Sequence, residues 1–144
     1  MPGSPLPPAV SRRLLPALTA VALVATAGSL YFSEVAGLVP CDLCWYQRVL
    51  MYPLVPILGV AAVEDRSAAW KTALPLSTLG VGVAAYHSWL QVQPSDTCSV
   101  GGGCGGIDWQ VAVFTIPRLS LLAFTLLTAG LLLVAREDVS AVDR

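Results

Sequence analysis

The four cysteines of this chain form two close pairs, and they are its clearest set of reactive groups. The first pair is Cys41-Asp-Leu-Cys44, and the second is Cys98-Ser-Val-Gly-Gly-Gly-Cys104. In a Cys-x-x-Cys pair one thiolate attacks a disulfide, and its neighbour then resolves the mixed disulfide. The spacing therefore predicts dithiols that exchange electrons with other thiols.

Two other uses of the cysteines are weighed against this prediction. Disulfides that only staple loops this short would stabilise the fold by roughly 2 kcal/mol each, and neighbouring helices already hold the loop ends. Four thiolates could instead bind zinc, since Cys-x-x-Cys is half of a zinc ribbon. The wider second pair and an oxidising location both disfavour zinc. We therefore predict redox-active Cys41, Cys44, Cys98 and Cys104, with no bound metal.

Two more side chains are expected near the first pair. A helix starting at about residues 44–46 places Cys44 at the positive end of its dipole, which favours thiolate. Arg48 follows one turn deeper on the same face, and His87, the only histidine, falls at a similar depth. We predict that Arg48 and His87 flank a polar pocket suited to the carbonyl oxygens of a quinone. The alternative is that Arg48 snorkels to the headgroups and that His87 is an ordinary interfacial residue. Gln47 and Tyr46 are weaker candidates.

The elements that must position these groups are predicted to be membrane helices. Of the 144 residues 56% are hydrophobic and 12% charged, whereas soluble domains carry about 25% charged residues. Four apolar stretches, at about 14–32, 46–63, 72–90 and 116–135, approach the roughly 20 residues of a membrane span. We predict one all-α domain over residues 1–144, an integral membrane four-helix bundle. The net charge of −1 argues against a nucleic-acid partner.

Within the spans, two sequence features predict local geometry. Prolines at positions 53, 56 and 75 are expected to kink their helices, which membrane bundles tolerate. A run of small residues in the third span is expected to permit close helix packing; it comprises Gly80, Gly82, Ala84 and Ala85.

The basic residues predict the orientation. Most Lys and Arg flank the chain ends and the connection between the second and third spans, which the positive-inside rule places in the cytoplasm; they are Arg12, Arg13, Arg66, Lys71, Arg136 and Arg144. The other two connections, with both cysteine pairs, then face outward and hold only Arg48 and Arg118. Trp45, Trp89 and Trp109 fall at outer span ends, as in an aromatic belt, and Trp70 at the inner side.

The N-terminus has two interpretations. Arg12-Arg13 before an apolar run that ends near Ala25-Thr-Ala27 is compatible with a cleaved signal peptide. The run is also long enough to span, which we favour, and Cys41 faces outward in either case. The Pro-rich residues 1–11 are expected to be a disordered tail.

The first cysteine motif resembles a known family. Cys41-Asp-Leu-Cys44-Trp-Tyr-Gln-Arg48 is similar to the signature of the DsbB/BdbC disulfide bond formation proteins. The stretch Phe114-Thr-Ile-Pro-Arg-Leu-Ser-Leu-Leu-Ala-Phe124 resembles the entry to that family's fourth helix. The short second cysteine loop is closer to the BdbC branch, and it leaves no room for the longer amphipathic segment of the DsbB branch.

The resemblance implies a quinone-dependent thiol oxidase in the bacterial plasma membrane. A soluble thioredoxin-fold oxidase of the DsbA/BdbD kind would attack the Cys98–Cys104 disulfide at Cys98. Exchange between Cys104 and Cys41 would pass the electrons inward, and Cys44 would deliver them to ubiquinone or menaquinone, with Arg48 stabilising the developing charge. The match of His87 to a quinone-site residue of the family rests on its depth and on an approximate alignment.

Three rival functions remain open. A vitamin K epoxide reductase-like enzyme has similar chemistry, but its quinone-side cysteine pair would belong to a late span rather than open the second. A thiol-based metal or haem carrier would hold metal with unreactive thiols. A structural membrane subunit would have two bridges that never exchange.

Overall fold

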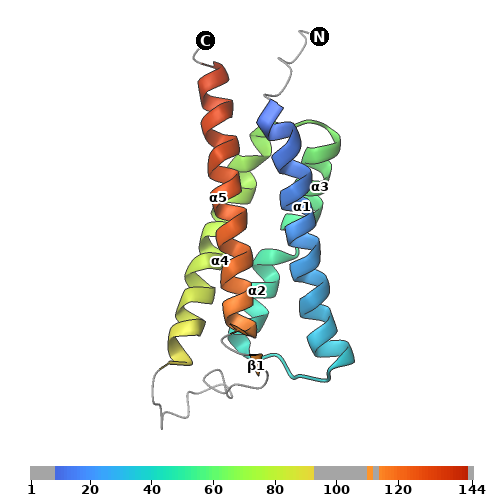
Figure 1. Cartoon of the computed structure of the whole chain (residues 1–144), viewed down its shortest axis with the longest axis vertical. Helices are drawn as coiled ribbons and strands as arrows, with labels where there is room; N and C mark the ends of the chain where they lie inside the picture. Colours follow the sequence, from blue (N-terminus) through green and yellow to red (C-terminus); the bar gives the residue numbers. More distant parts are fainter. Residues whose placement is uncertain (1–8, 93–109, 112–113, 143–144) are drawn as a thin grey trace.

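The computed structural model describes residues 9–92, 110–111 and 114–142. Within these ranges the chain is almost entirely helical, with four helical segments running side by side (Figure 1). One of these segments consists of two consecutive helices, α2 and α3. The elements are α1 (Ala9–Leu30) with the π-helical turn η1 (Tyr31–Val35), α2 (Asp42–Met51), α3 (Leu54–Val63), the 3-10 turn η2 (Ser67–Ala69), α4 (Trp70–Leu90) and α5 (Ile116–Val142). Two short antiparallel strands, β1 (Gln110–Val111) and β2 (Phe114–Thr115), precede α5.

The predicted all-α architecture is confirmed, and three helical stretches are long and apolar enough to cross a membrane. These stretches are Ala9–Val35, Asp42–Val63 and Ile116–Ala141. Helix α4 covers the predicted third span and has 21 residues, but it is not among these three. Lys71, His87 and several hydroxyl residues lower its apolar character. Its crossing of the membrane therefore stays a prediction.

Two predicted boundaries are wrong at the starts of helices. Helix α1 begins at Ala9, so residues 9–11 of the predicted tail are helical, and Ser11 is fully buried. Its backbone N–H and its hydroxyl both donate to the Glu137 carboxylate, at 3.1 and 3.0 Å, which satisfies a helix-start donor. Helix α2 begins at Asp42 rather than at residues 44–46, so Cys44 lies inside a helix and not in a loop.

The second predicted span is divided at a proline. Helix α2 ends at Met51, and α3 resumes at Leu54 after Tyr52 and Pro53. Proline has no N–H to continue the helical ladder. Pro56 falls in the first turn of α3, where a missing N–H costs little. Pro75 lies inside α4, which continues past it.

Small residues set the closest helix contact, between α4 and α5. A Cβ added at Gly80 would lie 2.1 Å from Phe124 Cε1, so only glycine fits there. Gly80 and Ala84 are buried on this face, one turn apart, whereas Gly82 and Ala85 are exposed. The small-residue run thus packs on one face only. Around it lie the buried residues Leu15, Leu18, Leu54, Leu58, Phe124, Leu127 and Leu131.

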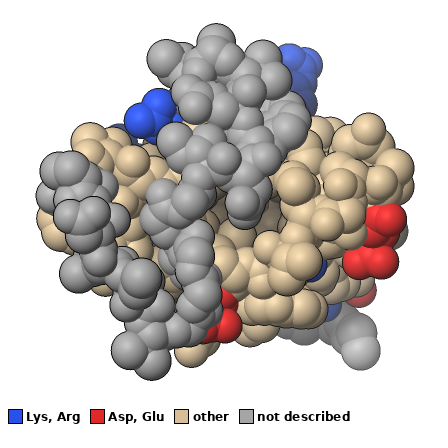
Figure 2. All heavy atoms as spheres, turned by 90° about the horizontal axis from the view of Figure 1, so that it is seen from below, with Lys and Arg blue, Asp and Glu red and all other residues tan. Residues whose placement is uncertain are grey.

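The two ends of the bundle differ in composition. The start of α1, the α3–α4 connection and the end of α5 meet at one end, and the start of α2 and the end of α4 lie at the other (Figure 1). The first end holds most of the basic residues, and there Arg12 pairs with Asp65 at 3.4 Å. Figure 2 views the molecule from below, which is the second end. Most of the described surface visible there is tan, and charged side chains are few. Trp45 and Trp89 are on this second end, as the aromatic pattern predicts, and both are more than half exposed.

Candidate functional site

The start of α2 places Cys41 and Cys44 side by side. Cys41 is the N-cap residue, with extended backbone (φ −72°, ψ 171°), and its carbonyl accepts the first helical hydrogen bond from Trp45 N–H at 3.1 Å. Cys44 lies in the first turn, and the Cys41 thiol donates to the Cys44 sulfur at 3.1 Å. A disulfide bond is about 2.0 Å long. The two sulfurs can therefore become bonded by a shift of roughly 1 Å.

The backbone around the pair favours negative charge on sulfur. The first N–H groups of α2 have no helical partners, and they point toward its N-terminus, where both sulfurs lie. Thiolate is the reactive form of cysteine, both in exchange and toward metals. The helix start thus stabilises the form that the predicted chemistry requires.

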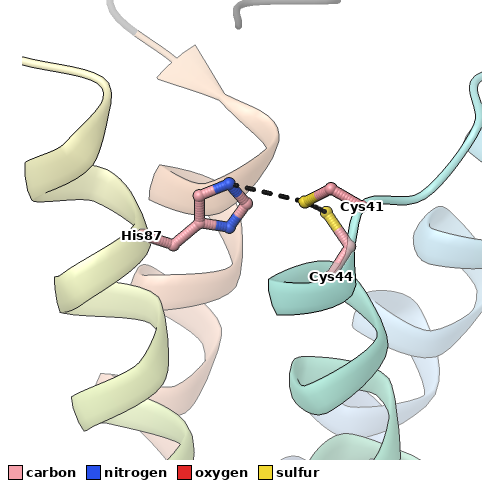
Figure 3. A group of neighbouring side chains, drawn as sticks. All are labelled: Cys41, Cys44 and His87. Atoms are coloured by element: carbon pink, nitrogen blue, oxygen red, sulfur yellow. Dashed lines mark hydrogen bonds between the residues drawn. The ribbon is translucent and has the colours of Figure 1, made fainter. Parts of the chain in front are cut away.

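His87 reaches the pair from α4 (Figure 3). Its Nε2 lies 3.8 Å from Cys41 Sγ, and its ring is only 2% exposed. Its other nitrogen, Nδ1, lies 3.0 Å from Nε2 of the Gln47 amide. In this amide orientation Gln47 donates to Nδ1, which leaves the ring proton on Nε2, facing Cys41. His87 is therefore a buried neighbour of the sulfurs.

A second contact holds the end of α4 beside the start of α5. The Thr115 hydroxyl donates to the Gln91 amide oxygen at 2.8 Å, and Thr115 is 3% exposed. Gln91 is the C-cap residue of α4 and lies one turn beyond His87. This bond fixes the helix end that carries the histidine.

Arg48, one turn after Cys44 on α2, contacts the end of α1 and the ring of Trp45. Its Nη2 donates to the Ser29 carbonyl at 3.1 Å, and its guanidinium lies 5.3 Å from the centre of the Trp45 ring. A backbone carbonyl and an aromatic face both stabilise a cation near the membrane. Arg48 therefore links α2 to the end of α1, and the alternative of free snorkelling does not describe it.

An apolar cavity of about 540 Å³ lies next to the site, and we call it the side groove. Its walls come from α1, η1, α2 and α5, and they include Val24, Gly28, Ser29, Phe32, Gln47, Met51, Ile116, Leu119, Ser120 and Leu126. Val24 and Leu126 are 72% and 50% exposed, so the groove reaches the outer surface of the bundle. Gln47 connects it to the cysteine site, because this residue lines the groove and its amide contacts His87.

Sequence reasoning located part of this arrangement. The structure brings Cys41, Cys44 and His87 together, with Arg48 adjacent. Cys98 and Cys104 lie outside the described residues, so their roles stay predictions. Tyr46, a weak candidate, is 62% exposed.

Gln47 was undervalued and Ser29 was missed. Gln47 is 6% exposed, and its position three residues after Cys44 puts it on nearly the same helix face. That spacing was the available signal. Ser29 contributes a backbone carbonyl, for which a sequence carries no signal.

Long apolar helices with a thiol pair at a helix start define a multi-pass membrane protein equipped for thiol chemistry. The comparison with known families then gives the particular group. Residues 11–134 match the family model described as disulfide bond formation protein DsbB, and the chain belongs to that family.

Relatives from several bacteria share most of the chain. It is 42% identical over 123 residues to disulfide bond formation protein C of Bacillus subtilis, covering 81% of this chain and 88% of that protein. A probable disulfide formation protein of Deinococcus radiodurans is 42% identical, with 76% and 80% covered. One from Metapseudomonas resinovorans is 34% identical, with 93% and 97% covered. The predicted similarity to the BdbC branch is confirmed.

Family membership has three consequences for this chain. It implies thiol oxidoreductase activity in disulfide bond formation. It implies a soluble partner of the DsbA/BdbD kind, and proteins of this family generally use quinones. The electron path through individual residues is a separate question.

Proposed function

We propose that this protein reoxidises a soluble thioredoxin-fold thiol oxidase outside the cytoplasm and passes the electrons to a membrane quinone. The observation that carries the proposal is the contact between an adjacent dithiol and the side groove, through His87 and Gln47. Electrons from thiols need an acceptor, and the groove supplies a place for a lipid-soluble one that Gln47 and His87 connect to the sulfurs.

The first steps are two thiol–disulfide exchanges. The partner's dithiol reduces the Cys98–Cys104 disulfide, and the partner leaves with a disulfide of its own. The Cys98–Cys104 dithiol then reduces the Cys41–Cys44 disulfide, through attack of Cys104 on Cys41. Two electrons and two protons move in each exchange, and the Cys41–Cys44 dithiol carries them to the membrane.

The side groove fits a quinone. Its volume of about 540 Å³ lies in the usual range of roughly 300–1,000 Å³ for ligand pockets. Its walls are almost entirely apolar, with the Gln47 amide and the Ser29 and Ser120 groups as polar exceptions. A bound quinone would supply a two-electron, two-proton acceptor, whether ubiquinone or menaquinone.

The chain's own residues prepare the last transfer. Re-formation of the Cys41–Cys44 disulfide releases two electrons and two protons. His87 Nε2 faces Cys41 and is placed to hold a proton there, with Gln47 fixing its tautomer. Arg48, bonded to the groove residue Ser29, adds positive charge at the groove edge and stabilises negative charge that develops there.

The proposed orientation has the cysteine end outside the cytoplasm and both termini inside, with α4 as a fourth span. The basic residues at the opposite end of the bundle support it through the positive-inside rule. A bacterial plasma membrane follows from the family's role in exported proteins.

A matched pair of glycine substitutions tests the groove. A side chain at Gly28 or at Gly82 meets no atom within 4 Å at its Cβ, but only Gly28 lines the groove. We expect Gly28→Leu to raise the KM for quinone by about tenfold or more, because the four carbon atoms of the leucine side chain occupy part of the site. Gly82→Leu should leave the KM unchanged. Equal kinetics for the two variants would place the quinone elsewhere.

The thiol steps provide the second readout. Exchange between the partner's dithiol and the oxidised protein, measured without quinone, should proceed equally in both glycine variants. If Gly28→Leu slowed this exchange as well, the groove would serve the protein partner rather than the quinone.

A further inference from the structure

We propose that the reduced form of this site is a metal-binding site, in which Cys41, Cys44 and His87 bind a thiophilic divalent cation of the zinc class. Binding itself rests only on these three side chains. The inhibition that it would cause rests on the proposed function. The class of metal ion follows from the donor atoms, since zinc prefers soft thiolate sulfur and imidazole nitrogen as ligands.

The distances between the three ligand atoms suit one tetrahedral ion. Both sulfurs and a ring nitrogen of His87 lie within 4.8 Å of one another. Bond lengths of about 2.3 Å to sulfur and 2.0–2.1 Å to nitrogen give ligand separations of roughly 3.8 Å for S···S and 3.5 Å for S···N. The structure has 3.1 Å between the sulfurs and 3.8 Å from Cys41 Sγ to His87 Nε2. Opening the sulfurs by about 0.7 Å reaches the tetrahedral value, and the fourth position is left to water.

Charge favours the ion in this location. Two adjacent thiolates carry two negative charges at the end of an apolar bundle, which is costly without compensation. A divalent cation with a neutral imidazole makes the set neutral. On binding, two S–H bonds are replaced by two metal–sulfur bonds, two protons go to solvent, and no electrons move.

Gln47 allows His87 to become a ligand without losing its hydrogen bond. At present its amide nitrogen faces His87 Nδ1, so the proton is on Nε2. To bind metal through Nε2 the ring must carry its proton on Nδ1 instead. Rotation of the Gln47 amide brings its oxygen to Nδ1 as an acceptor, the outer-shell contact typical of metal-bound histidines. Gln47 can therefore form a hydrogen bond with His87 in either tautomer of the ring, through its amide nitrogen or its amide oxygen.

The consequence is competition between the metal and disulfide formation. Sulfurs bonded to the ion cannot bond to each other until it leaves. The oxidised site offers only His87 and therefore lacks affinity. The site would thus bind metal only when electrons have arrived and no quinone has taken them.

The experiment uses the full chain with C98S/C104S, reduced and in detergent micelles, so that the only thiols are Cys41 and Cys44. Titration with Co²⁺, followed by displacement with Zn²⁺, should show one ion per chain and a sulfur-to-cobalt charge-transfer band. Oxidation to the disulfide or Cys44→Ser should remove the band. His87→Ala should weaken binding more than tenfold, and Gln47→Ala by about 10–100-fold.

The matched control is Ser88→Ala, next to His87 on α4, where the hydroxyl that is lost has no hydrogen-bond partner among the described residues. It should keep the affinity of the parent. Thermal unfolding of each metal-free variant checks that it is folded; for a variant that does not fold, His87→Gln replaces His87→Ala. Unchanged affinity without His87, or equal affinity in the oxidised protein, would overturn the proposal. Quinone reduction is absent from this assay, so a negative result here leaves the proposed function standing.

Discussion

The two ends of this bundle use polar groups in opposite ways. At the end where α1 starts, Glu137 and Asp138 of α5 accept hydrogen bonds from Ser11, Ser67 and Trp70, and so join three segments. At the other end, Gln47 and His87 form a chain of contacts that leads to a sulfur. One polar cluster connects helices, and the other connects a reactive pair to a groove.

The difference suggests how a small membrane protein separates stability from chemistry. The carboxylate end fixes the helices where no cavity is needed. The tight packing of Gly80 against Phe124 also holds α4 and α5 together. The cysteine end leaves a cavity of about 540 Å³, which Gln47 and His87 connect to the sulfurs. Substitutions at the first end should change stability, and those at the second end should change electron transfer.

The largest effect is expected from Cys44→Ser. We expect quinone reduction to fall by more than about a thousandfold, because serine cannot form the disulfide that releases electrons. The midpoint of thermal unfolding should stay near that of the parent. Optical measurement of quinone reduction, driven by a reduced partner oxidase, checks the rate. Normal turnover without Cys44 would remove this residue from the electron path.

A smaller loss is expected for His87→Ala. Without the imidazole the ring nitrogen that faces Cys41 is lost, so quinone reduction should fall by about 10²-fold. Single-turnover kinetics should assign the loss to the step after the Cys41–Cys44 dithiol forms. If partner exchange slowed while quinone reduction did not, His87 would act on the thiol steps instead.

Arg48 allows charge and geometry to be separated. Arg48→Lys keeps the cation but loses the planar contact with Trp45 and the bond to Ser29, and we expect the KM for quinone to rise about tenfold. Arg48→Gln should raise it further, since the charge is also removed. Steady-state kinetics with varied quinone concentration compares them. Equal KM values for Lys and Gln would show that charge does not matter there.

The smallest effect belongs to the opposite end. Asp138→Asn keeps the size of the side chain but weakens the hydrogen bonds from Ser67 and Trp70. We expect a loss of about 1 kcal/mol in the free energy of unfolding. Quinone reduction per folded molecule should be unchanged. A large drop in kcat would contradict the separation of the two ends.

Much of this arrangement is predictable from the sequence, because its main signals are local. Apolar length located the helices, and the motif from Cys41 to Arg48 identified the site and its family. The start of α2 was predicted too late because Asp42 is charged, yet the helix begins at Asp42 with Cys41 as its N-cap residue. Helix boundaries depend on caps more than on hydropathy.

The contacts between helices were harder to predict. The depth of His87 in its span agrees with its place near the sulfurs, but its pairing with Gln47 depends on how α2 and α4 face each other. The direction of Arg48 depends on a backbone carbonyl of Ser29. The side groove is formed by packing of α1, α2 and α5, and no single helix shows it.

One single-turnover measurement tests the central claim most directly. The C98S/C104S protein, with Cys41 and Cys44 reduced, is mixed anaerobically with a quinone, and quinol and remaining thiols are both counted. The account predicts one quinol formed for each Cys41–Cys44 disulfide, with no thiols left. Quinone that stays oxidised beside intact thiols, in folded protein, would contradict it.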